Sequence, residues 1–179
     1  MLASDAVIFA SIALGALVGD KGRWWTPNNF NLAVPKGNLE LLTSFLLTQI
    51  YQEQCYGAGW QWEQSTRTFI CFEHPVLHHT MILSGSCMWS VLPVVLTTCL
   101  TASMIAITLR HIFTFYPHLL FSGCIVAGYC LLNSGAWASH VERGLEFSTD
   151  TSSWNHPCSF GCPVLIQRVR GLWGIQIMN

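Results

Sequence analysis

The chain has 179 residues and a formal net charge of −1; charged residues make up 9% of it and hydrophobic residues 51%. A typical soluble domain carries about 25% charged residues, so this chain has too little charge to coat a water-facing surface. A net charge near zero also provides no basic patch for phosphates, which excludes a nucleic-acid-binding protein. The length and composition therefore predict an integral membrane protein with one modest domain, and its apolar stretches predict an all-α fold with about three transmembrane helices.

The first apolar stretch, Ala6–Gly19, has 14 residues, a length that fits a signal-peptide core or a short membrane anchor. The residues before it include an acid and no Lys or Arg, which is untypical of a signal peptide. Ser11, Gly15 and Gly19 recur every four residues and would lie on one helix face, where small residues allow close packing. We predict a short, uncleaved transmembrane helix over residues 1–19.

Residues 20–80 form a polar-to-mixed segment, which we predict to be a loop domain. Turn-forming residues occur at 26–29 and 35–38, and the apolar run 39–51 indicates either a short helix or two strands. A strand-like stretch includes residues 69–72. Four tryptophans are predicted to anchor this domain at the membrane interface or to bind a partner: Trp24, Trp25, Trp60 and Trp62.

Two long apolar runs follow the loop domain. Arg110 is the only formal charge across 74–141, and each run that it delimits exceeds the roughly 20 apolar residues needed to cross a bilayer. We predict transmembrane helices near Met81–Leu109 and Ile112–Ala138, which together form a tight hairpin over residues 81–138.

The second helix of this hairpin carries Gly123 and Ala127, four residues apart, and this spacing of small residues predicts close helix packing. Residues 139–179 are predicted to form a polar tail. Its final apolar run is interrupted by arginines, which favours an interfacial segment over a further span.

The loop domain contains two cysteines, Cys55 and Cys71. If this segment lies outside the cell or in a lumen, a disulfide between them is predicted. If it lies in the cytosol, both are expected to be free thiols. The sequence leaves both alternatives open.

A second cluster of reactive side chains consists of Cys71, His74, His78 and His79. His74 and His78 are four residues apart and would share a helix face, and zinc and haem iron accept His and Cys ligands. Pro75 disfavours a helical conformation at His74. The cluster therefore predicts either a metal site or polar aromatic side chains where the chain enters the membrane.

Three short segments are similar to the tetraspan superfamily of claudins, peripheral myelin proteins and epithelial membrane proteins. Residues 20–25 resemble the tryptophan-bearing exit of its first helix, residues 81–84 the start of its second, and residues 119–130 its third. The resemblance implies a large extracellular loop and a function in cell contact. The fourth helix has no counterpart, which implies a form truncated before it, and Gly-Leu-Trp stands in the tail instead of the first loop.

The basic residues oppose this family topology. With three spans and the N-terminus outside, seven of the eight Lys and Arg residues would face the cytosol. This arrangement is favoured, because Lys and Arg in short loops are typical of the cytoplasmic side of a membrane. The family places residues 20–80 outside the cell instead. The topology of this segment therefore stays open.

Taken together, these features predict an integral membrane protein without catalytic activity, located in the plasma membrane rather than in an organelle. We expect it to act in cell contact, as at a cell junction, or as an accessory subunit of a channel or receptor. Its expected partners are membrane lipids and other membrane proteins, with no nucleic acid and no cofactor. Two alternatives are a membrane redox or metal-dependent enzyme using the Cys/His cluster, and a small structural subunit of a larger membrane complex.

Overall fold

The computed structural model describes residues 4–18, 27, 29–57, 66–98, 100–126, 138–142, 144–148 and 176–178. The strands are β1 (Val7–Phe9), β2 (Asn29–Val34), β3 (Gln52–Gly57), β4 (Thr66–Glu73), β5 (Thr80–Ser86), β6 (Ile105–Ile107), β7 (Ile112–Thr114), β8 (Cys124–Val126), β9 (Glu146–Ser148) and β10 (Gln176–Met178). The helices are α1 (Ser11–Val18), α2 (Leu39–Thr48), α3 (Leu92–Leu96), α4 (Pro117–Ser122), α5 (Ala138–Glu142) and the 3₁₀-helix η1 (Thr101–Ser103).

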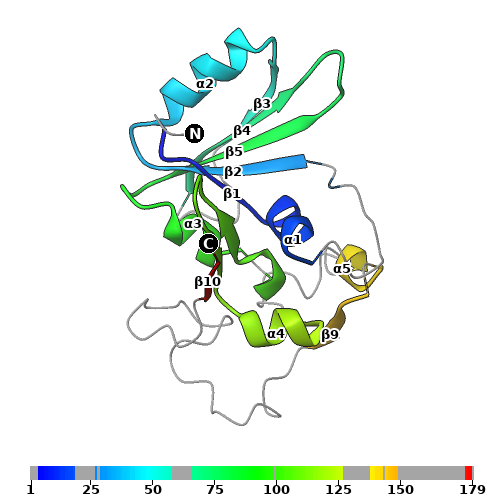
Figure 1. Cartoon of the computed structure of the whole chain (residues 1–179). Helices are drawn as coiled ribbons and strands as arrows, with labels where there is room; N and C mark the ends of the chain where they lie inside the picture. Colours follow the sequence, from blue (N-terminus) through cyan, green and yellow to red (C-terminus); the bar gives the residue numbers. More distant parts are fainter. Residues whose placement is uncertain are drawn as a thin grey trace.

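Eight of these strands form one mixed sheet in the order β10-β7-β6-β1-β2-β5-β4-β3, and β8 and β9 form a separate parallel pair. Within the large sheet, β2 and β5 run parallel and the other neighbouring strands run antiparallel. Figure 1 shows the long strands β2 to β5 side by side, with short helices around them. The fold is therefore mixed α/β.

The predicted all-α membrane fold with about three transmembrane helices is wrong. Throughout the described ranges, no helix is long and apolar enough to cross a membrane. The predicted location in a membrane, with the plasma membrane preferred, is contradicted with it, because that prediction depended on the spans. The three apolar stretches are divided into short elements instead, each for a local reason.

The first stretch changes direction inside the predicted helix. Residues 7–9 form β1, which pairs with β2 and β6, and Ala10 then adopts a positive φ of 60°. The chain turns there and continues as α1, only eight residues long. A span of residues 1–19 is therefore replaced by a strand, a turn and a helix within 4–18.

The stretch predicted as one helix over 81–109 contains β5, α3, η1 and β6. The Ser86 hydroxyl accepts a hydrogen bond from the Met88 amide at 3.0 Å and donates one to the Ser90 carbonyl at 2.8 Å. Side-chain bonds of this kind compete with helical backbone bonds. Pro93 stands in the first turn of α3, where its missing amide hydrogen costs least.

The third stretch, predicted as a helix over 112–138, begins with β7 and α4. Helix α4 ends at Gly123, whose φ of 78° closes the helix, and its amide donates to the Leu120 carbonyl. A glycine adopts this left-handed conformation readily, so the helix stops and β8 begins. The predicted hairpin of two long helices is thus absent from the described part of this region.

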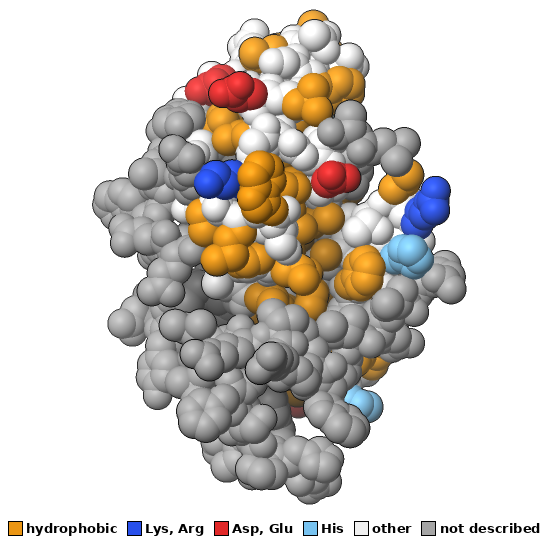
Figure 2. All heavy atoms as spheres, turned by 90° about the vertical axis from the view of Figure 1, so that its left-hand side faces the viewer, with side chains coloured by type: hydrophobic (Ala, Val, Ile, Leu, Met, Phe, Trp, Pro, Cys, Tyr) orange, Lys and Arg blue, Asp and Glu red, His pale blue; other side chains and the backbone are white. Residues whose placement is uncertain are grey.

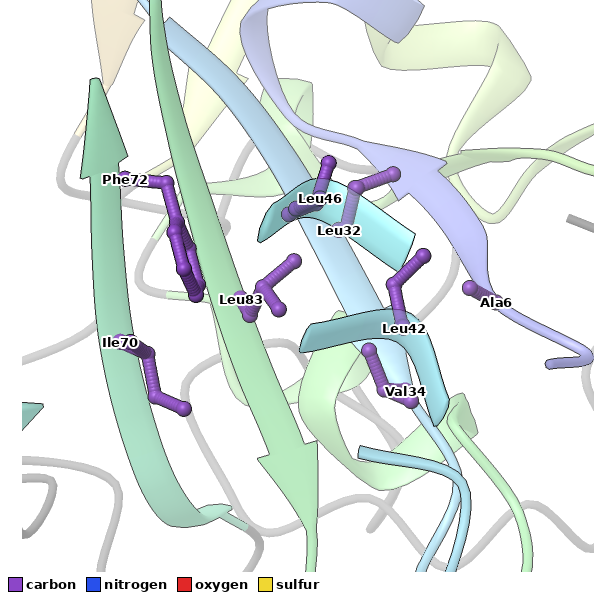
Figure 3. Packing of buried hydrophobic residues seen from close by; sticks show 8 residues of the cluster. All are labelled: Ala6, Leu32, Val34, Leu42, Leu46, Ile70, Phe72 and Leu83. Atoms are coloured by element: carbon purple, nitrogen blue, oxygen red, sulfur yellow. The ribbon is translucent and has the colours of Figure 1, made fainter. Parts of the chain in front are cut away.

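Helix α2 covers one face of the sheet. Its residues Leu42 and Leu46 are buried against side chains from β2, β4 and β5, as Figure 3 shows. The eight residues of this first cluster are Ala6, Leu32, Val34, Leu42, Leu46, Ile70, Phe72 and Leu83. The apolar run 39–51 therefore contains a helix at 39–48, one of its two predicted alternatives, and the strand predicted around 69–72 is confirmed as part of β4.

The opposite face of the sheet is covered by α3. Val94 and Val95 pack there with Ala33 of β2 and Phe9 of β1, which alternate along their strands with residues of the first cluster. Helix α1 packs on a third cluster, in which Leu14 contacts the region of η1, β6 and β8. These layers leave the free edge of β3, and the connection between β5 and α3, at the surface.

Candidate functional site

The strands β3 and β4 bring two thiols together. Cys55 lies directly opposite Cys71 in the antiparallel register, next to a bulge between Glu53 and Cys55. Cys71 stands between Ile70 and Phe72, whose side chains are buried under α2, so its own side chain points to the other face. Cys55 is exposed and Cys71 half-buried.

The Cys55 thiol affects the ionisation of Cys71. Burial raises the pKa of Cys71 to about 12, and a hydrogen bond and charge repulsion from Cys55 add to this effect. Cys71 therefore stays protonated to a higher pH than an ordinary cysteine.

The predicted disulfide between Cys55 and Cys71 is wrong: the structure holds both as free cysteines. The prediction applied to a loop domain that lies outside the cell or in a lumen. Instead, both residues belong to strands of the large sheet, and its backbone hydrogen bonds set their separation without a covalent bond.

We expect Cys71 to react slowly with iodoacetamide near pH 8, because the thiolate is the reactive form. Replacing Cys55 by serine removes the neighbouring ionisable thiol, so the pKa of Cys71 should fall and its reaction rate should rise. Burial in the fold raises the pKa of Cys71 from 9.0 to about 12. The contribution of Cys71 to the free energy of unfolding is therefore present below pH 9 and is lost as the pH rises from 9 towards 12. Alkylation rates of Cys71, followed by mass spectrometry from pH 7 to 11, measure its ionisation. A rise in the wild-type rate with its midpoint near pH 9 would contradict the raised pKa.

The histidines of the predicted metal cluster have other contacts. His74 follows β4, and its Nδ1 accepts hydrogen bonds from the amides of Val76 and Leu77 at 3.2 and 3.1 Å. Its ring lies edge-on to Tyr51, with centroids 5.0 Å apart. The His74 side chain thus stabilises the turn between β4 and β5.

His78 and His79 point to different neighbours. The Nδ1 atom of His78 lies 3.5 Å from a carboxylate oxygen of Glu73, and the ring of His79 lies 6.4 Å from that of Phe30. In the part of the chain that the structure describes, no three His, Cys, Asp or Glu side chains are grouped to hold a metal ion. The structure therefore brings Cys71 to Cys55, and it does not bring His74, His78 and His79 to Cys71.

The residues predicted to pack transmembrane helices, where the structure describes them, lie in different elements. Ser11 and Gly15 lie half-buried on α1, whereas the fully buried residues of that helix are Ala13 and Leu14. Gly123 ends α4, and a Cβ atom placed on it would have no neighbour within 4 Å, so its observed role is conformational. Six further residues with predicted roles lie outside the described residues: Gly19, Ala127, Trp24, Trp25, Trp60 and Trp62.

Trp89 is the most exposed large hydrophobic residue among the described residues. It lies in the connection between β5 and α3 (residues 86–92), which we call the Trp89 loop. Trp89 is 79% exposed, Met88 53% and Leu92 37%. The side of the molecule on which this connection lies is shown in Figure 2, where hydrophobic side chains gather across the middle and a basic side chain lies beside them.

Hydrogen bonds hold the Trp89 loop in this position. Besides the two bonds of the buried Ser86 hydroxyl, the Ser90 hydroxyl accepts a bond from the Leu92 amide at 3.2 Å. The Lys36 amide donates to the Met88 carbonyl at 2.8 Å, which joins the loop to the turn before α2. Gly37 in that turn has a φ of 92°, and a Cβ there would lie 3.5 Å from the Trp89 ring, so the turn passes close to it.

No sequence pattern indicates this surface, because Met88 and Trp89 lie in an apolar run that predicts a membrane span. The structure defines a mixed α/β domain with an exposed aromatic loop that is held by hydrogen bonds. Comparison with models of known protein families finds no match, and comparison with curated proteins finds none either.

The resemblance to the claudin superfamily thus gains no support from these comparisons. The predicted function, an integral membrane protein in cell contact or an accessory channel or receptor subunit, is contradicted because the spans it required are replaced by short elements. The alternatives of a membrane enzyme and a subunit of a membrane complex depended on the same spans.

Proposed function

We propose that this chain is a protein-binding domain that docks an apolar segment of a partner protein on the Trp89 loop. The observation that carries the proposal is the 79% exposure of Trp89 in a loop whose backbone is fixed by hydrogen bonds. Trp and Met are enriched where protein interfaces are buried, and Trp is among the commonest residues that dominate binding energy.

The rigidity of the loop favours binding. A flexible loop loses conformational entropy when a partner orders it, and this loss weakens the complex. Here Ser86 and Ser90 fix the loop from within, and the amide of Lys36 fixes it from the neighbouring turn. The side chains of Met88 and Trp89 are therefore presented before any partner arrives.

The charge beside the loop indicates the chemistry of the partner. Lys36 is exposed, and its backbone amide donates to the Met88 carbonyl, so this basic residue lies next to the Trp89 loop. A segment with an apolar side chain and an adjacent Asp or Glu would bury Trp89 and pair with Lys36. Such a charge pair at the rim contributes mainly to the association rate and to salt dependence.

A photo-crosslinking experiment tests this proposal. Benzoylphenylalanine is placed at position 89 of the full chain in cells that express it, and at Val76 as a matched control. Val76 is 71% exposed in the β4–β5 connection. We expect a discrete adduct from position 89 alone, with an acidic residue in the crosslinked partner peptide. No adduct at 89, the same adducts from both positions, or an adduct to a second copy of this chain would each contradict the proposal.

With that partner in hand, Trp89→Ala is expected to weaken binding by about 30-fold, which corresponds to a hot spot of about 2 kcal/mol. Lys36→Glu should slow association and reduce its salt dependence, whereas Val76→Ala should leave the Kd unchanged. The free energy of unfolding of all three variants should stay within about 0.5 kcal/mol of wild type, because the changes are at the surface. Titration calorimetry measures the Kd; an unchanged Kd for Trp89→Ala would refute the proposed docking surface.

A further inference from the structure

We propose that Cys55 and Cys71 together form a two-thiolate site for a soft monovalent cation of the Cu(I) class. The two residues stand opposite each other in β3 and β4, and both are free. Strand β3 is at the edge of the sheet and Cys55 is exposed, so an ion can reach the pair from solvent.

The register of the strands sets the spacing of the two ligands. Directly opposed residues of antiparallel strands have Cβ atoms about 4.5–5.5 Å apart. Metal–sulfur bonds are about 2.3 Å long for zinc, so an ion bound between two thiolates holds their sulfur atoms at most about twice that distance apart. The side chains can therefore bracket one ion without any movement of the backbone.

The number of ligands selects the ion. A structural Zn(II) site takes four protein ligands in a tetrahedron. Among the residues that the structure describes, no third His, Cys, Asp or Glu is grouped with this pair to complete such a set. Soft thiolates select Cu(I), and Cu(I) is satisfied by two of them in a linear arrangement. The pair therefore suits Cu(I) better than Zn(II).

The surroundings of the pair favour a cation of low charge. Cys71 is paired on its other side with Ile82 of β5, which is apolar, while Glu73 is two residues along β4 and points to the same face. Two adjacent thiolates repel each other, and a cation between them removes that repulsion. On binding, one Cu(I) forms two Cu–S bonds, two thiol protons leave to solvent, and no electron is transferred.

Copper binding to the full chain tests the inference. The protein is kept reduced with a phosphine under anaerobic conditions, and Cu(I) is titrated in competition with bicinchoninate. We expect Cys55→Ser and Cys71→Ser each to bind one equivalent less than wild type. The matched control Cys124→Ser, which changes another free cysteine, should bind as wild type does. Full binding by both pair variants, or an equal loss in the control, would overturn the proposal.

A measurement on the unmodified chain avoids any effect of the substitutions on folding. The wild-type protein is loaded with one equivalent of Cu(I), alkylated and digested, and its labelling is compared with that of the metal-free protein. Protection confined to Cys55 and Cys71, with Cys124 still labelled, supports the site. Protection of other cysteines in their place, or a copper absorption spectrum with more than two sulfur ligands, would contradict it.

Discussion

Replacing Phe72 by alanine is expected to lower the free energy of unfolding by about 3–5 kcal/mol. Phe72 is fully buried between α2 and the sheet, where it belongs to one cluster with Leu46 and Leu83 (Figure 3). The substitution removes these contacts and leaves a cavity, which the hydrogen-bonded strands on both sides of β4 cannot close. Domains have only about 5–15 kcal/mol of stability in total, so the loss would be severe.

The matched control is Phe45→Ala, the same chemical change on the outer side of α2, where the ring is 53% exposed. We expect it to cost less than about 1 kcal/mol. Urea denaturation followed by circular dichroism compares the two variants. If Phe72→Ala does not fold, Phe72→Leu should still fold with a loss of about 1.5 kcal/mol. Equal effects of the two alanine variants would contradict the packing of α2 on the sheet.

The second large effect is expected at Leu14, which is fully buried in α1. Its side chain packs in the cluster that includes Ile105 of β6 and Leu120 of α4. Leu14→Ala should therefore cost about 2–5 kcal/mol.

Leu47→Ala serves as its control, because Leu47 is 52% exposed on α2. The same urea titration should show almost no change for it. If Leu14→Ala were as mild as Leu47→Ala, the packing of α1 against β6 and α4 would be refuted.

Part of the fold can be predicted from local sequence. The run 39–51 was predicted as a helix or two strands, and α2 forms because Leu39, Leu42 and Leu46 share one helical face towards the sheet. The turn at 35–38 follows from its Pro and Gly, and the Asn38 amide donates to the Pro35 carbonyl as expected of a turn.

The predicted spans fail because a continuous apolar run does not distinguish a membrane helix from a strand buried on both faces. In β5, Leu83 contacts the cluster under α2 while Ala33 of the neighbouring β2 contacts the cluster under α3, so both faces of this sheet need apolar residues. Alternation of polar and apolar residues disappears in such strands. Short breaks such as the positive φ of Ala10 have no signal in composition.

The candidate sites depend on pairings between distant residues. The sequence indicates that Cys55 and Cys71 share a segment, but only the register of β3 and β4 places them opposite each other. It also groups His74 with Cys71, whereas the alternation of β4 and the following turn separate them. The exposure of Trp89 depends on bonds from Ser86 and from Lys36, fifty residues apart, which no local pattern encodes.

The central claim is that, in the described ranges, the apolar runs of this chain form short helices and short strands, most of which belong to one mixed sheet. The most direct test is a backbone NMR assignment of the full chain, with secondary chemical shifts and interstrand NOEs for residues 80–86 and 29–34. The account predicts strand shifts at both segments and contacts in the parallel register that pairs Leu32 with Leu83. Continuous helical shifts from Met81 to Leu109, without contacts to residues 29–34, would contradict it.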